Sequence, residues 1–237
     1  MAARQSGWSA TVLVTRPEPG AGETAAALRA LGHVPVLAPV LRIEPMIIAA
    51  PRHVAAIAIT SGQALAGLPS ALRALPLYAV GDASARRAFE AGFRWVESAG
   101  GTARDLARLM ADRLPPGAAV LLASGVGNGL DLASDLRAAG LRVSRRVAYR
   151  TVPAETLAIA AIAALEADEV DFVLIFSPAS ARRFVALVQG AGVEPGLRRV
   201  MAIAISAAAA APLAALSLRG VRIAMAPDQK HMLALLS

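Results

Sequence analysis

Short runs of aliphatic residues recur along the chain, and most are followed by a turn and then by apolar residues three or four positions apart. Residues 12–14 and 120–122 are two such runs, each followed by a glycine-containing loop and by a segment with helical spacing. Uninterrupted apolar runs of this length are typical of buried parallel strands, and the longer spacing is typical of amphipathic helices. The pattern therefore predicts alternating strands and helices, the α/β class of fold.

The chain repeats this pattern. Residues 11–45 align without a gap with residues 119–153, and Leu28, Arg29 and Gly32 recur as Leu136, Arg137 and Gly140. Each copy has the order strand, helix, strand, which predicts a right-handed βαβ unit. A glycine directly after a helical segment commonly ends the helix, so we expect both glycines to do so.

A second repeat follows each copy of the first. Residues 54–65 match residues 170–181, and residues 77–96 resemble residues 200–225. The order predicts two flavodoxin-like, doubly wound domains of five parallel strands each, with the ligand between them. The repeat leaves the pairing open: a tandem split falls near residues 114–117, whereas joining the first unit to the last makes one domain discontinuous, with crossings near residues 38–41 and 148–153.

Composition narrows the chemistry. The chain has 237 residues, a formal net charge of +7 and no cysteine, which excludes disulfides, thiol nucleophiles and cysteine-bound zinc. The three histidines are far apart, so we expect no metal site. The arginines are spread along the chain and aromatic residues are few, so we expect a small polyanionic ligand rather than nucleic acid.

We expect a cytoplasmic protein with no membrane span. Residues 1–10 contain no apolar core of a signal peptide. The uncharged stretch at residues 200–218 is long enough to cross a bilayer, but Pro212 and two serines interrupt it. Its first half resembles a buried strand followed by a turn.

Candidate ligand-binding residues lie in the turns that follow strands. Parallel sheets bind ligands at the carboxyl ends of their strands, where helix N-termini favour anions. Serine, threonine and glycine are also ordinary helix caps and turn residues, so each of these residues has a structural explanation as well. The candidates for substrate binding are Arg16, Thr60, Ser61, Gly62, Ser84, Ser177, Ser180 and Ser206.

Two further features have competing interpretations. The glycine-rich residues 124–129 follow a strand, as a dinucleotide-binding loop does, but Leu130 stands where the third glycine would fall and Arg145 and Arg146 follow instead of an acid. Tyr149 lies at the end of a strand, near one of the two candidate crossings. It either packs at a domain edge or acts as a proton donor.

Several motifs, in order along the whole chain, resemble the uroporphyrinogen-III synthase family. They are the opening VLVTRP, LGH at 31–33, ITSGQA at 59–64, AVGDASA at 79–85, VAYRTVP at 147–153 and FSPASA at 176–181. The resemblance implies conversion of the linear tetrapyrrole hydroxymethylbilane into uroporphyrinogen III, with inversion of ring D and loss of water. It also implies no metal and no organic cofactor. We expect the protein to be a monomer.

The resemblance also implies a domain arrangement and roles for particular residues. Residues 1–38 with 154–237 would form a discontinuous domain and 42–148 an inserted one, joined by a two-stranded linker at 38–41 and 148–153. Tyr149 matches the family's tyrosine and becomes the candidate acid. The hydroxyl positions that contact substrate in the family match Thr60, Ser61, Ser84 and Ser177.

The chain departs from the family pattern at three places. Ser84 stands where threonine is usual, and Ser206 is followed by a run of alanines where the family usually has glycine and a threonine-bearing turn. Residues 124–129 are also unusually rich in glycine. A non-catalytic or regulatory tetrapyrrole-binding protein of the same fold is therefore the first alternative. A nucleotide-binding enzyme, indicated only by residues 124–129, is the second.

Overall fold

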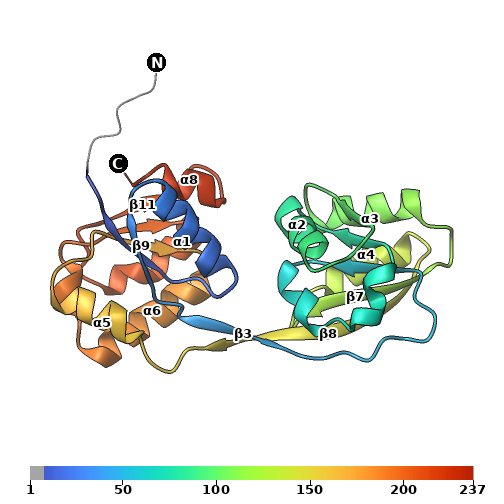
Figure 1. Cartoon of the computed structure of the whole chain (residues 1–237), viewed down its shortest axis with the longest axis horizontal. Coiled ribbons are helices and arrows are strands. Elements are labelled where there is room, and N and C mark those ends of the chain that lie inside the picture. The colour runs from blue at the N-terminus through green and yellow to red at the C-terminus, as the bar shows by residue number, and fades with distance from the viewer. Residues whose placement is uncertain (1–7, 237) are drawn as a thin grey trace, which may run out of the picture. The chain divides into compact units, whose positions relative to one another are not determined.

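The chain forms two compact units in the computed structural model, which describes residues 8–236. One unit consists of Met1–Arg42 and Val152–Ser237, and the other of Ile43–Thr151. The expectation that no signal peptide is present concerns mainly residues 1–7, and these lie outside the described residues. Figure 1 shows strands β3 (Leu41–Pro45) and β8 (Arg142–Pro153) side by side where the chain passes from one unit to the other.

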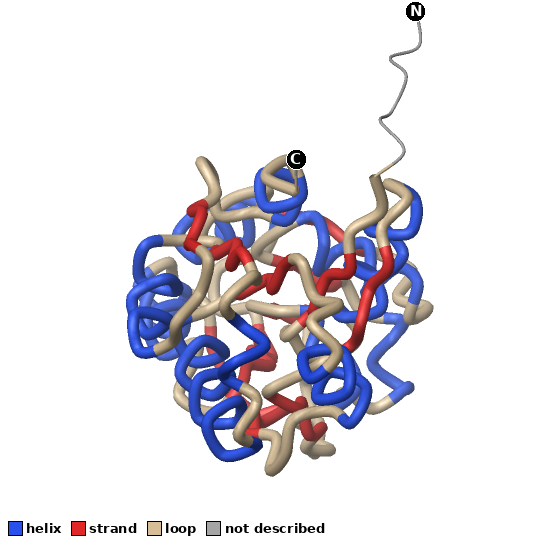
Figure 2. The backbone as a smooth tube through the Cα atoms, turned by 90° about the vertical axis from the view of Figure 1, so that its left-hand side faces the viewer, coloured by secondary structure: helices blue, strands red, loops and turns tan. Residues whose placement is uncertain are grey.

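The discontinuous unit is a five-stranded parallel sheet in the order β11-β10-β9-β1-β2. Figure 2, in which this unit faces the viewer, shows helices surrounding the strands. The strands are β1 (Thr11–Val14), β2 (Val34–Leu37), β9 (Phe172–Ile175), β10 (Met201–Ala204) and β11 (Gly220–Ile223). The helices are α1 (Gly20–Ala30), α5 (Ile159–Glu166), α6 (Pro178–Ala191), α7 (Ala207–Ala210) and α8 (Gln229–Leu233), with 3₁₀ turns at Glu194–Leu197 and Ala211–Ala215.

Alternating side chains of this sheet bury two separate cores. Leu13 of β1 belongs to the core under α5, α6 and α7, whereas Val12 and Val14 belong to the core under α1 and α8. All three side chains are fully buried. An all-apolar strand is required at this position because a sheet covered on both faces has no solvent-facing side.

The inserted unit repeats this architecture with one strand more. Its sheet has the order β3-β8-β7-β4-β5-β6. The remaining strands are β4 (Ala56–Ile59), β5 (Leu77–Ala79), β6 (Val96–Ser98) and β7 (Ala119–Gly125). One face is covered by α2 (Asp82–Glu90) and the 3₁₀ turns Gly62–Gly67 and Ser70–Ala74, and the other by α3 (Ala103–Arg113) and α4 (Leu130–Ala138).

The repeated glycines end their helices as the sequence predicts. Gly32 and Gly140 both have φ of 84°. The amide of Gly32 donates to the Arg29 carbonyl at 3.0 Å, and the amide of His33 donates to the Leu28 carbonyl at 3.0 Å. Residues 136–141 repeat these bonds at the end of α4. The conserved spacing between the two copies therefore encodes the same Schellman ending twice.

The predicted fold class is confirmed, with one correction. The sequence predicts five strands per sheet, but β3 pairs with β8 and gives the inserted unit a sixth. The stretch at residues 200–218 begins with β10 and continues into α7 and a 3₁₀ turn, as its pattern indicates. None of the helices formed by residues 8–236 is both long and apolar enough to cross a membrane.

Phe184 is the largest fully buried side chain of the discontinuous unit, so we expect Phe184→Ala to lower the free energy of unfolding by roughly 3–5 kcal/mol. Ile159→Ala is the matched control, because Ile159 lies in the same unit and is 85% exposed. It should change stability by about 0.5 kcal/mol at most.

The two tryptophans allow the unfolding of each unit to be measured separately. Trp8 packs edge-on against Phe172 of the discontinuous unit, at 5.9 Å between ring centroids, and Trp95 belongs to the inserted unit. In a Trp95→Phe background, fluorescence in urea follows Trp8 alone. Equal destabilisation by Phe184→Ala and Ile159→Ala would contradict the assignment of this core.

Candidate active site

The carboxyl edge of the discontinuous sheet carries two serine caps. Ser177 follows β9 and caps α6: its Oγ accepts from the Ser180 amide at 3.0 Å, and the Ser180 Oγ accepts from the Ser177 amide at 3.0 Å. Ser206 follows β10 and accepts from the Ala209 amide at 3.3 Å. Ser180 is buried, whereas Ser177 and Ser206 are half-buried. Both caps are therefore partly accessible at this edge.

Arg16 lies at the same edge, directly after β1, and is fixed by contacts within its own unit. Its guanidinium donates to Gln229 Oε1 at 3.1 Å and lies 4.6 Å from the centre of the Phe176 ring. Thr24 Oγ1 also donates to Gln229 Oε1, at 2.8 Å. A side chain at Gly20 would collide with the Arg16 guanidinium. These contacts hold a positive charge near the strand ends of β1 and β9.

The inserted unit gathers its predicted residues at the turn after β4. Ser61 caps the turn by accepting from the Gln63 amide at 3.3 Å. The Gly62 amide donates to Ser84 Oγ at 3.0 Å, which links the turn after β4 to the first turn of α2. A Cβ on Gly62 would lie 2.9 Å from Arg87 Cδ. Thr60, Ser61, Gly62 and Ser84 are all half-buried.

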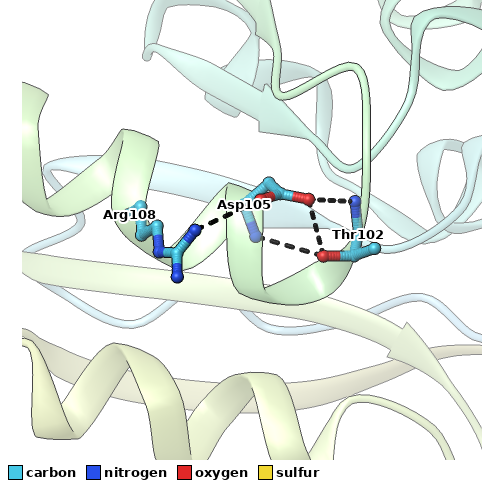
Figure 3. Close-up of polar contacts among 3 residues, drawn as sticks. All are labelled: Thr102, Asp105 and Arg108. Carbon is cyan, nitrogen blue, oxygen red and sulfur yellow. Dashed lines mark hydrogen bonds and ion pairs between the residues drawn. The ribbon is translucent and has the colours of Figure 1, made fainter.

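The third turn at this edge, after β6, is a complete capping box (Figure 3). The Thr102 amide and hydroxyl donate to Asp105 Oδ2 at 2.8 and 2.7 Å, and the Asp105 amide donates back to Thr102 Oγ1 at 3.3 Å. Arg108 lies 3.7 Å from the other carboxylate oxygen. The hydrogen bonds from Thr102, together with nearby Arg108, lower the pKa of Asp105. The Thr102 and Asp105 side chains both satisfy backbone amides at the start of α3. Capping therefore accounts for the threonine in this turn, and no ligand is needed to explain it.

Each glycine of the glycine-rich residues 124–129, at the end of β7 and in the loop that follows, has a structural explanation. Gly127 and Gly129 have φ of 75° and 79°, in the left-handed region that favours glycine. Gly125 lies against the ring of Tyr149, where a Cβ would approach within 2.7 Å of Cζ. Arg145 donates to the Asn128 carbonyl at 2.9 Å and so closes the loop. A dinucleotide is not needed to account for this sequence.

Tyr149 lies at the carboxyl edge of the inserted sheet, in register with Gly125 of the neighbouring strand. Its side chain is 7% exposed and packs in the same core as Ile59 and Ala64. Its phenol oxygen makes no hydrogen bond to any described residue, and every fully buried polar side-chain atom among them has a partner. The oxygen therefore reaches solvent while the ring is buried.

The structure thus brings the predicted residues together as two sets. One set lies at the carboxyl edge of the inserted sheet, with Tyr149 on β8, Thr60, Ser61 and Gly62 directly after β4, and Ser84 in the first turn of α2, which follows β5. Arg16, Ser177, Ser180 and Ser206 lie at the corresponding edge of the other sheet. The equivalent turns after β4 and β9 each begin with a serine cap, Ser61 and Ser177.

Two residues at these edges were not predicted from sequence. Arg87 lies one helical turn after Ser84, so helical spacing would have placed it on the same side of α2. Gln229 comes from the far end of the chain and is brought to Arg16 only by the fold. Within residues 8–236, no group of three or more histidine, aspartate or glutamate side chains is placed to hold a metal.

The fold and these two edges define the class of protein: a two-unit, doubly wound α/β protein with polar helix N-termini at the carboxyl edge of each sheet. The family model described as uroporphyrinogen-III synthase HemD matches residues 22–234. The chain belongs to the uroporphyrinogen-III synthase family and is accordingly a cyclising lyase of tetrapyrrole biosynthesis.

The chain shares its fold with a solved structure of the family. The uroporphyrinogen-III synthetase of Helicobacter pylori 26695 is 16% identical with a TM-score of 0.61, over 95% of this chain and 97% of that one. The uroporphyrinogen III synthase of Thermus thermophilus is 20% identical with a TM-score of 0.41, over 95% and 97% of the two chains. A search of curated proteins finds no significant match.

The capping box of α3 makes a pH-dependent contribution to stability. Because the pKa of Asp105 is lowered in the folded state, its carboxylate stabilises the fold above the unfolded pKa, and this contribution is lost as pH falls through the folded pKa. We expect Asp105→Asn to be less stable than the wild type at pH 7, and the difference to shrink below about pH 4.

Asp112→Asn is the matched control, since it makes the same charge change on the same helix. Thermal unfolding of both variants at pH 7 and pH 3 measures the effect. A stability difference for Asp105→Asn that stays constant over this range would contradict the assigned role of its carboxylate.

Proposed function

We propose that the chain binds hydroxymethylbilane through the carboxyl edges of both sheets and that Tyr149 protonates the leaving hydroxyl. The substrate carries several carboxylates. The two edges offer helix N-termini and half-buried hydroxyls at Ser61, Ser84, Ser177 and Ser206. Free amides and a partial positive charge at helix N-termini favour carboxylates. The net charge of +7 acts in the same direction.

Arg16 is the positively charged candidate among these residues. Its contacts with Gln229 and Phe176 hold the guanidinium in place before substrate arrives. A positioned charge loses less conformational freedom on binding than a mobile one. We therefore assign Arg16 to a substrate carboxylate.

The substrate supplies most of the reactivity in this proposal. Proton donation by the Tyr149 phenol allows the hydroxyl to leave as water, and the adjacent pyrrole nitrogen supplies the electrons that give an azafulvene. The terminal pyrrole then attacks through its substituted carbon, and the resulting spiro intermediate rearranges to the inverted ring D with loss of a proton. The protein fixes one conformation of the chain and excludes direct closure.

The observation that carries the proposal is the position of Tyr149. Its ring is buried, its oxygen reaches solvent, and it lies at the same edge as the hydroxyls of the inserted unit.

Neither a metal nor an organic cofactor takes part in the proposed steps, and we expect a cytoplasmic monomer that binds no nucleic acid. The departure that suggested a non-catalytic tetrapyrrole binder lies at the carboxyl edge of the discontinuous sheet, where Ser206 is followed by exposed Ala207 and Ala208.

One assay tests the catalytic function. Hydroxymethylbilane is generated in place, because it is unstable, and the product isomers are separated after oxidation. We expect the type III isomer to predominate. Formation of the type I isomer alone, as without enzyme, would contradict catalysis, and tetrapyrrole binding under those conditions would identify the regulatory alternative.

We expect Tyr149→Phe to lower kcat by roughly tenfold or more, because general acid catalysis contributes at least that much, with little change in stability. Tyr78→Phe is the matched control, since Tyr78 is the other tyrosine and lies on the opposite face of the sheet. Initial rates and thermal unfolding are measured for both. Wild-type turnover in Tyr149→Phe would remove Tyr149 as the acid.

A further inference from the structure

The strand that carries Tyr149 contains one extra residue just before it. Ser124 of β7 lies opposite Val147, but the next residue, Gly125, lies opposite Tyr149. Ala148 therefore has no partner across this pair of strands. One unpaired residue of this kind is a β-bulge, which bends the strand and redirects the side chain that follows.

The bulge changes the face on which Tyr149 lies. In a regular strand successive side chains point to opposite faces. Ala148 and Tyr149 are nevertheless both buried in the same core. Val143, an even number of residues before Tyr149, packs against the opposite core. In a regular strand of the same sequence, Tyr149 would lie on the same face as Val143, away from Ala64 and the turn after β4.

Gly125 provides the space into which the redirected ring fits. A Cβ on Gly125 would lie 2.7 Å from Tyr149 Cζ, 2.8 Å from Cε2 and 2.9 Å from the phenol oxygen. Unlike Gly127 and Gly129, Gly125 does not have a positive φ. Its backbone conformation is open to any residue, so space for the tyrosine ring is the reason for glycine here.

A second glycine accommodates the bulge from the other side. A Cβ on Gly67 would lie 2.6 Å from the Met46 carbonyl oxygen and 3.0 Å from Ala148 Cα. The Ala148 carbonyl also accepts a hydrogen bond from the Met46 amide at 2.8 Å. Gly67 thus allows the backbone of the turn to pack directly on the bulged residue.

We infer that Gly125, together with the bulge at Ala148, is a positioning residue for Tyr149: it sets where the phenol oxygen lies at the edge of the sheet. No hydrogen bond to a described residue holds that oxygen, so packing around the ring determines its position. The inference rests on the proposed function only for its effect on turnover. The geometric effect on the tyrosine can be measured without substrate.

Gly125→Ala tests the inference. An added methyl group must displace the ring, and a displaced acid loses catalytic efficiency steeply with distance. We expect kcat to fall by about tenfold or more while KM changes by less than about threefold. Gly190→Ala is the matched control, because Gly190 lies in α6 without a positive φ and with open space around its Cβ position. It should leave both constants unchanged.

The double variant Gly125→Ala/Tyr149→Phe separates positioning from general damage. If Gly125 acts through the phenol, Gly125→Ala causes little further loss of kcat in a protein that already carries Tyr149→Phe. A full additional loss in the double variant would overturn the inference. If Gly125→Ala does not fold, Gly125→Ala/Tyr149→Ala should fold, because the obstructing ring is gone. Failure of that variant to fold would also overturn it.

Nitration of the tyrosines by tetranitromethane, located by mass spectrometry of peptides, gives a readout that does not depend on activity. We expect Gly125→Ala to change nitration of Tyr149, relative to Tyr78, by about threefold or more, because overpacking forces the ring from its position. An unchanged ratio would overturn the inference. If the wild type proves inactive, the proposed function fails, while this ratio still decides whether Gly125 positions Tyr149.

Discussion

The pairing of β1 with β9 is the constraint on which the rest of the structure depends. It aligns Val12, Leu13 and Val14 with residues about two-thirds of the chain away, and the fully buried hydroxyl of Thr15 closes the junction by donating to the Leu174 carbonyl at 2.6 Å. In the sheet, β1 lies between β2, which follows it closely in sequence, and β9, which does not. The chain between β2 and β9 must therefore leave this sheet and later rejoin it. The inserted unit and the two passages through β3 and β8 follow from that pairing.

The same parallel arrangement explains why polar residues collect at one edge of each sheet. Several helices begin at this edge with a short polar cap, although Gly81 and Gly129 begin α2 and α4 without a side-chain cap. Ser177, Ser206 and Thr102 each have a partner within their own helix. Capping therefore accounts for the polar residue types at these edges, and the caps alone do not mark an edge as a binding site.

Tyr149 illustrates how an irregularity of the backbone places a side chain. A bulge and two glycines hold a ring that no hydrogen bond to a described residue orients. The glycine-rich loop at residues 124–129, which resembles a phosphate-binding loop in sequence, is accounted for by this packing and by two left-handed residues. A sequence typical of a phosphate-binding loop can thus arise from the space that a tyrosine ring needs and from the conformation of the turn.

The sequence by itself determined the class of fold, the repeat, the helix ends at Gly32 and Gly140, and the turns that carry the candidate residues, because these depend on local periodicity and on backbone conformation. Which half-unit pairs with which depends on contacts between residues far apart in the chain, and the repeat alone fitted both arrangements. The sixth strand, the contact of Gln229 with Arg16 and the face on which Tyr149 lies were decided only by the tertiary structure. Each arises from strand register or long-range packing, which leaves no local signal in the sequence.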